Sequence, residues 1–180
     1  MINQHILIGI AGHKGSGKST VARQLIKYLY RDKDYECSVL HFAQPIKQLV
    51  CEQFDIDTEQ LERVKNNPIV RQCLQNVGSQ GRQQDPAHWI NQLEKFYNNL
   101  KSSVPAVVID DVRFQNEAFW IRRNAGILLH VHRKSVDSAA DYHESEANIR
   151  YLGGDFNINN DGTVEELEAQ VKEFIRKFKL

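Results

Sequence analysis

The chain has 180 residues, and its length and balanced charge narrow the classes of protein it can belong to. With 41% apolar residues, it is long enough to bury one sizeable core and short for two. Lys plus Arg and Asp plus Glu number 23 each, so the surface has no net basic field that would draw it onto nucleic acid or anionic lipid. We therefore expect one domain with neither a nucleic-acid nor a membrane partner.

The three cysteines lie far apart in the sequence and have no CxxC spacing. Such cysteines are typical of free thiols in a reducing compartment, not of a disulfide or zinc framework. The apolar start of the chain has no basic leader or cleavage site, and no apolar run approaches the roughly 20 residues needed to cross a bilayer. These features predict a cytoplasmic protein.

Short apolar runs alternate along the chain with segments of helical period. Strands are predicted where β-branched residues run together near a turn signal, at 6–10, 38–42, 106–109, 127–131 and 156–158. Helices are predicted at 20–30, at 46–54, at 89–100 and after Thr163, which forms a capping-box pattern with Glu166. This order predicts an α/β fold with a five-stranded parallel sheet and helices on both faces. The polar stretches 55–84 and 134–154 are interpreted as excursions from the sheet.

Residues 12–19, GHKGSGKS, match the phosphate-loop (P-loop) motif GxxxxGK[ST] at every fixed position, between the first predicted strand and the first helix. Glycines let the backbone turn and aim N–H groups at phosphate oxygens, and the helix adds its positive N-terminal end. Lys18 is expected to reach the β- and γ-phosphates of ATP, and Ser19 to bind Mg²⁺. The residues predicted to bind ATP here are Gly12, Lys14, Gly15, Ser16, Gly17, Lys18, Ser19 and Thr20.

The third predicted strand ends in two carboxylates, Asp110 and Asp111. A group that holds Mg²⁺ directly or through water belongs at this place, and we assign Asp110 to the metal, although the sequence leaves open which of the two points inward. The DxxG and NKxD motifs of a GTPase switch are absent from the sequence. The P-loop and carboxylates therefore favour a kinase.

Four arginines fall near predicted strand ends or in the polar excursions: Arg71, Arg82, Arg113 and Arg133. A monophosphate acceptor is already ionised, so the main task of a kinase acting on it is to bring two polyanions together. Guanidinium groups do this by bidentate phosphate contact. The sequence thus predicts ATP-dependent transfer to a phosphorylated small molecule. A non-catalytic ATP-binding module and a nucleic-acid-dependent ATPase remain as alternatives.

Several other short sequence blocks accompany the P-loop. Three are continuous: FAQPIK at 42–47, RQCLQ at 71–75, followed by Gly78 and Arg82, and DVRF at 111–114, followed by Asn116 and Glu117. The others are Arg133 and the group of Asp141, His143, Ser145 and Glu146. With these blocks the chain resembles the bacteriophage deoxynucleoside monophosphate kinases, in the adenylate-kinase-like branch of P-loop proteins, over nearly its whole length. The resemblance implies one kinase domain, 1–180, that uses ATP and Mg²⁺. It also implies an acceptor-binding arm at about 45–100 and a lid at about 133–154.

The resemblance also implies roles for single residues. Those expected in the acceptor pocket are Lys47, Arg71, Gln75 and Arg82, and Phe42 is the aromatic we expect to contact the base. Asp111 and Arg113 would face the reacting phosphates, Arg133 would approach the transferred group, and Asn160 would lie near the base of ATP.

Two positions depart from the family pattern, because Gln44 stands where an acidic residue is expected and Ser19 where many relatives carry Asp. Phosphomevalonate kinase and dephospho-coenzyme A kinase share the general architecture. The acceptor, and whether the chain forms a homodimer, therefore stay open at this point.

Overall fold

The computed structural model of the chain describes residues 5–137 and 149–180. They divide into two compact units, which we call the sheet unit (Met1–Leu40 and Tyr97–Leu180) and the helical unit (His41–Phe96). No helix in the described residues is both long and apolar enough to cross a membrane.

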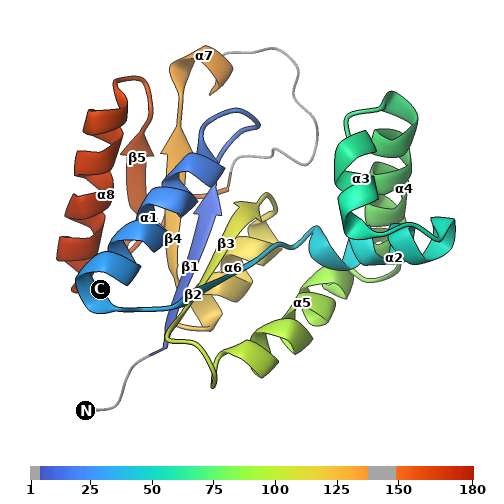
Figure 1. Cartoon of the computed structure of the whole chain (residues 1–180), viewed down its shortest axis with the longest axis horizontal. Helices are drawn as coiled ribbons and strands as arrows, with labels where there is room; N and C mark the ends of the chain where they lie inside the picture. The colour runs from blue at the N-terminus through green and yellow to red at the C-terminus, as the bar shows by residue number, and fades with distance from the viewer. Residues whose placement is uncertain (1–4, 138–148) are drawn as a thin grey trace. The chain divides into compact units, whose positions relative to one another are not determined.

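The sheet unit holds five parallel strands in the order β2-β3-β1-β4-β5 (Figure 1). The strands are β1 (Ile6–Ala11), β2 (Cys37–Leu40), β3 (Ala106–Val112), β4 (Ile127–His132) and β5 (Phe156–Asn159). The five predicted strands and their parallel arrangement are confirmed. Their ends differ slightly, because β2 stops at Leu40 and β3 continues through both carboxylates to Val112.

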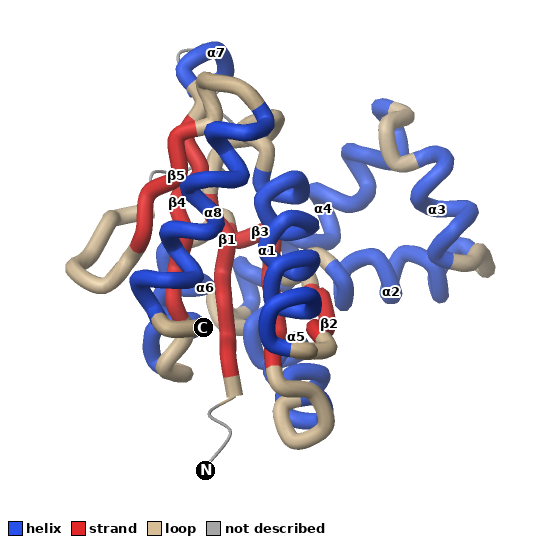
Figure 2. Tube along the Cα trace, turned by 60° about the vertical axis from the view of Figure 1, so that its left-hand side comes forward, coloured by secondary structure: helices blue, strands red, loops and turns tan. Residues whose placement is uncertain are grey.

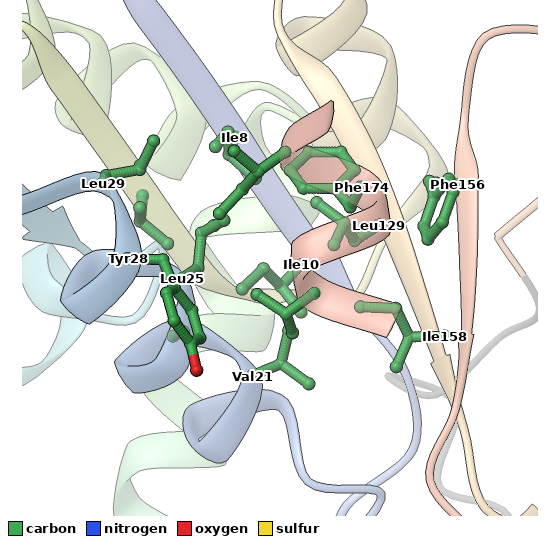
Figure 3. Close-up of a cluster of buried hydrophobic side chains, with 14 of the residues drawn as sticks. Ile8, Ile10, Val21, Leu25, Tyr28, Leu29, Leu129, Phe156, Ile158 and Phe174 are labelled. Carbon is green, nitrogen blue, oxygen red and sulfur yellow. The ribbon is translucent and has the colours of Figure 1, made fainter. Parts of the chain in front are cut away.

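Helices cover both faces of this sheet, as predicted. On one face α1 (Lys18–Lys33) and α8 (Val164–Phe178) lie side by side (Figure 2). Ile8 and Ile10 of β1 pack in the buried cluster with both helices (Figure 3). The residue between them faces the other way, since a Cβ at Gly9 would lie 2.9 Å from Ile121 Cγ1 of α6 (Gln115–Arg123). This alternation is that of a strand buried on both faces.

The start of α8 confirms the capping box expected from the sequence. Thr163 Oγ1 accepts a hydrogen bond from the backbone N–H of Glu166 at 3.3 Å, and Glu166 Oε2 accepts one from Thr163 N–H at 2.9 Å. Two N–H groups that the helix itself leaves unsatisfied are thereby paired. The short helix α7 (Lys134–Asp137) follows β4.

The helical unit contains α2 (Gln44–Phe54), α3 (Thr58–Val64), α4 (Pro68–Gln84) and the first part of α5 (His88–Leu100). Its small core comprises Val50, Cys51 and Leu61, against which Ile56, Val70, Cys73, Leu74 and Val77 pack. The polar stretch 55–84 therefore folds mostly into two helices that we did not predict. Both have clear start signals: Asp57 and Gln60 form a capping box, and Asn67 caps α4 with Pro68 in the first turn.

Candidate active site

The P-loop joins the end of β1 to the start of α1. Gly12 packs tightly, because a Cβ there would lie 2.4 Å from the carbonyl oxygen of Val131 in β4. Lys18 folds back over the loop, and its Nζ donates to the carbonyl oxygens of Gly12 at 2.7 Å and His13 at 2.9 Å. The ammonium group is thus held at the loop by weak neutral acceptors. A phosphate oxygen would make a stronger, charge-assisted partner.

The first turn of α1 is suited to an anion. It contains no acidic residue, and its N-cap, Gly17, has no side chain to accept from the free N–H groups. The partial positive charge of the helix terminus is therefore not neutralised by the helix itself. Ser16 is fully buried just before this turn, and its Oγ has no hydrogen-bond partner among the described residues.

The carboxylate pair lies at a β-bulge next to the P-loop strand. β1 and β3 pair in register as far as Gly9 with Ile109, but Ala11 then pairs with Val112. β3 therefore has one extra residue in the segment that contains Asp110 and Asp111, and a bulge changes the direction of the side chains there. Both residues are half-buried. Carboxylate oxygens are ligands that Mg²⁺ prefers, so either residue has suitable chemistry to hold it.

Arg113 follows this strand, and its backbone is fixed by a residue whose function we did not predict. Glu117 Oε2 accepts hydrogen bonds from the N–H groups of Arg113 at 2.7 Å and Phe114 at 3.0 Å. Burial raises the pKa of Glu117 to about 8, and the Asp111 carboxylate acts in the same direction, while the two N–H donors oppose them. Burial therefore favours the neutral form of the Glu117 carboxyl beside Asp111. The Arg113 side chain itself is exposed.

Two residues distant in sequence reach the P-loop. Arg133, just after β4, has its Nη1 3.5 Å from the carbonyl oxygen of Gly15. Asn160, just after β5, donates from Nδ2 to the carbonyl oxygen of Ser16 at 2.7 Å. The structure thus brings two of the predicted site residues to the P-loop.

The residues predicted to bind the acceptor lie in the helical unit. Arg71, Gln75 and Arg82 share one stripe of α4 with the spacing of four and seven residues that places side chains on one helix face. Arg71 is exposed, and Gln75 and Arg82 are partly exposed. Phe42 is buried, with an exposed fraction of 3%.

Lys47 has a partner that the sequence did not reveal. Its Nζ lies 2.6 Å from Glu62 Oε1, and the other oxygen of Glu62 is paired with Lys65. The hydrogen bonds from Lys47 and Lys65 lower the pKa of Glu62 to about 2. Lys47 is therefore balanced by an ionised carboxylate at neutral pH.

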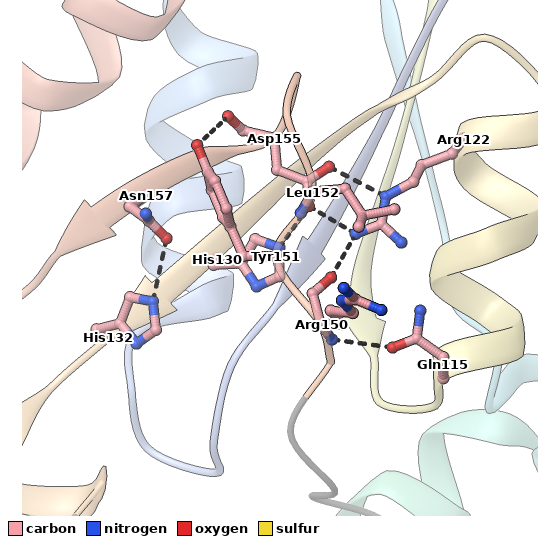
Figure 4. Close-up of polar contacts among 9 residues, drawn as sticks. All are labelled: Gln115, Arg122, His130, His132, Arg150, Tyr151, Leu152, Asp155 and Asn157. Atoms are coloured by element: carbon pink, nitrogen blue, oxygen red, sulfur yellow. Dashed lines mark hydrogen bonds and ion pairs between the residues drawn. The ribbon is translucent and has the colours of Figure 1, made fainter.

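A second polar cluster in the sheet unit centres on Asp155, which is 4% exposed (Figure 4). Arg122 donates to both of its carboxylate oxygens, at 3.1 and 2.6 Å, and His130 Nε2 lies 2.9 Å from Oδ2. Burial tends to raise the pKa of Asp155, but the Arg122 guanidinium, the Leu152 N–H and His130 together hold it below its usual value. The cluster fixes the chain just before β5.

Four residues of the resemblance, Asp141, His143, Ser145 and Glu146, lie outside the described residues.

Comparison with known proteins connects this geometry to one family. A family profile described as deoxynucleotide monophosphate kinase matches residues 52–171. A protein of Acanthamoeba polyphaga mimivirus, named provisionally as a deoxynucleotide monophosphate kinase, is 33% identical over 92% of this chain and 94% of its own length. The deoxynucleotide monophosphate kinase of Enterobacteria phage T4 is 25% identical over 68% of this chain, which spans only 52% of that protein.

Solved structures agree with the fold. The Mycobacterium tuberculosis APS kinase CysC, solved in complex with AMPPNP and APS, superposes with a TM-score of 0.56 and 11% identity, over 98% of this chain and 99% of that one. At this identity the likeness shows the fold alone, and that fold is the predicted one.

Proposed function

The chain belongs to the deoxynucleotide monophosphate kinase family, and from this premise we propose that it transfers the γ-phosphoryl group of ATP to a deoxynucleoside monophosphate. The products are the deoxynucleoside diphosphate and ADP. The observation that carries the proposal is the P-loop between β1 and α1, with Lys18 held over it, in a chain of this family. The comparisons contain no support for the non-nucleotide acceptors or the non-catalytic module considered above.

On the ATP side, the P-loop N–H groups and the start of α1 bind the phosphates. Lys18 leaves its two carbonyl partners for the β- and γ-phosphate oxygens. An oxygen of the acceptor phosphate attacks the γ-phosphorus, the bond from that phosphorus to the β–γ bridging oxygen breaks, and ADP leaves with the electron pair. Arg133, which lies beside Gly15, and Arg113 stabilise the negative charge that spreads over the transferred group.

Ser19 and Asp110 would hold Mg²⁺. The donors fit this ion, because a hydroxyl and a carboxylate are hard oxygen ligands. Ser19 follows β1 and the P-loop, and Asp110 lies in β3, the strand next to β1 in the sheet. Bound Mg²⁺ supplies neutralisation of charge on the ATP phosphates. Asp111, the next residue along the bulged strand, faces the reacting phosphates in this proposal.

The acceptor binds through the helical unit. Lys47 and the α4 stripe of Arg71, Gln75 and Arg82 supply three cations and one amide for a phosphate ester, whereas Phe42 is buried and has almost no exposed surface with which to contact a base. Guanidinium groups suit this task because they contact two phosphate oxygens at once.

The three cysteines are free in the described part of the chain. Burial raises the pKa of Cys37 to about 11, so this thiol stays protonated and unreactive at neutral pH. Because the described cysteines form no disulfide, we propose that the enzyme works in a reducing compartment, the cytoplasm.

The test is an acceptor screen. The purified protein is incubated with Mg-ATP and each of the four deoxynucleoside monophosphates, the ribonucleotides, phosphomevalonate or dephospho-coenzyme A, and ADP formation is measured. We expect ADP, together with a deoxynucleoside diphosphate, only in the presence of at least one deoxynucleoside monophosphate. ADP formation with a non-nucleotide acceptor alone, or with none of the compounds, contradicts the proposal.

A further inference from the structure

The peptide that joins Ser16 to Gly17 is held from outside the P-loop by the side chain of Asn160. Asn160 Nδ2 donates to the Ser16 carbonyl oxygen at 2.7 Å across 144 positions of sequence. Gly17 adopts a φ of 103°, and a Cβ at this residue would lie 2.2 Å from Asn160 Nδ2. The Asn160 amide therefore occupies the space beside Gly17, and glycine is required there both by its φ and by Asn160.

This contact determines the direction of an N–H group. A trans peptide is planar, so its C=O and N–H point in opposite directions, and no cis peptide occurs in the described residues. Fixing the carbonyl of Ser16 fixes the N–H of Gly17, which belongs to the loop that cradles phosphates. Because glycine rotates easily about φ, this peptide would otherwise reorient at low cost.

Asn160 is itself held firmly. Its backbone N–H donates to the carbonyl oxygen of His132 at 2.8 Å. The preceding residue, Asn159, makes two hydrogen bonds with the side-chain amide of Gln170 in α8. Asn159 N–H donates to Gln170 Oε1, and Gln170 Nε2 donates to the Asn159 carbonyl oxygen, both at 2.8 Å. On the other side, Asp161 Oδ1 accepts from Lys134 N–H at 2.7 Å. The end of β5 and the start of the loop that follows it, residues 159–161, are thus hydrogen-bonded to α8, β4 and α7.

We propose that Asn160 is a positioning residue for phosphate binding: through the Ser16 carbonyl it aims the Gly17 N–H at the triphosphate. The inference rests on the proposed function only in taking the P-loop as the ATP site. It differs from a place near the base of ATP, which the family resemblance implies for Asn160, because its effect acts on phosphate and not on adenine. An amide is required, since a carboxylate in its place would repel the carbonyl oxygen.

The test compares Asn160→Asp and Asn160→Ala with Asn157→Ala. Asn157 is a matched control on β5, where its side-chain oxygen lies 3.2 Å from His132 Nε2 (Figure 4). Calorimetry measures the dissociation constants of Mg-ATP, Mg-GTP and inorganic tripolyphosphate. We expect Asn160→Asp to weaken all three by about tenfold and Asn160→Ala by about threefold, and Asn157→Ala to change none.

Two further measurements separate positioning from a general loss of structure. In steady-state assays the KM for ATP should rise in Asn160→Ala, while the KM for the deoxynucleoside monophosphate stays at its wild-type value. If Asn160→Asp does not fold, Asn160→Ala carries the test. The inference is overturned if tripolyphosphate binds the Asn160 variants as tightly as wild type, or if only the preference for ATP over GTP changes. Because binding is read without turnover, failure of the proposed acceptor leaves this result interpretable.

Discussion

The P-loop of the sheet unit and the cationic stripe of α4 in the helical unit, for which we propose phosphate binding, are built in two different ways. The P-loop is made mainly of backbone groups, set on a fully buried strand and braced by Asn160 and Arg133. The α4 stripe is made of side chains on a helix whose unit has a small core. A backbone site tolerates little change in sequence, whereas a side-chain site can be altered residue by residue. We infer that the part of the reaction common to kinases resides in the first and acceptor choice in the second.

The largest expected effect is that of Lys18→Ala, which removes a charge from the backbone site. We expect kcat to fall by at least about 10³-fold, because Lys18 supplies the P-loop ammonium group that we propose contacts both the β- and γ-phosphates. The matched control is Lys33→Ala, at the exposed end of the same helix. Circular dichroism and kcat are measured for both. Wild-type kcat in a folded Lys18→Ala protein would contradict the assignment.

Arg113→Ala should have the next largest effect. We expect kcat to fall by about 10²-fold with a much smaller change in the KM for ATP, because this guanidinium acts on charge that develops during transfer. Arg123→Ala, also exposed and at the end of the helix that follows, serves as the control. A rise in the KM for ATP with unchanged kcat would place Arg113 in ground-state binding instead.

Gly81→Ala tests the support of the α4 stripe. A Cβ at this position would lie 2.6 Å from the ring atoms Cε2 and Cζ2 of Trp89, whose indole N–H donates to the Gly78 carbonyl oxygen at 2.8 Å. Alanine favours the helix, but the rigid ring cannot yield without breaking that bond. We expect a net loss of about 1–2 kcal/mol in urea unfolding.

The control for this variant is Gly153→Ala, since a Cβ there meets no atom of the described residues within 4 Å. We expect its unfolding midpoint to match that of wild type. If Gly81→Ala is as stable as wild type, the Trp89 ring can shift to accommodate the added methyl group, contrary to what these distances imply.

The features that could be predicted from the sequence are those encoded by consecutive residues. The five strands are near-continuous apolar runs, and the P-loop is a fixed spacing of glycines, lysine and serine, so both were recognised locally. The helices α3 and α4 were missed because they bury few apolar residues, and α4 contains two glycines that a helix normally avoids. The starts of both helices were nevertheless encoded by Asp57 and by Asn67 with Pro68.

The missed contacts share a different cause. Asn160 meets Ser16, and Glu62 meets Lys47, only because the fold brings separate elements together. Asn and Glu are common on loops and helices, and nothing in their immediate sequence distinguishes these two. A residue that acts through another therefore needs the structure to be found, whereas a motif of consecutive residues does not.

The smallest expected effect is that of Glu62→Gln, and it tests whether the side-chain site is adjustable. Glu62 is ionised at neutral pH and balances Lys47 and Lys65. Without its charge, both lysines offer more positive potential to a phosphate ester. We expect the KM for the acceptor to fall about threefold, with little change in stability, since partly exposed ion pairs contribute little to folding.

Glu59→Gln is the matched control for Glu62→Gln, because Glu59 lies on the same helix and pairs with the exposed Arg63 instead of Lys47. Its KM for the acceptor should equal that of wild type. The difference between the two variants should shrink as salt is raised, since screening weakens exposed charges. A rise in the acceptor KM in Glu62→Gln would mean that Glu62 instead orients Lys47 toward the phosphate. The ion pair would then preorganise the acceptor site although both side chains are partly exposed.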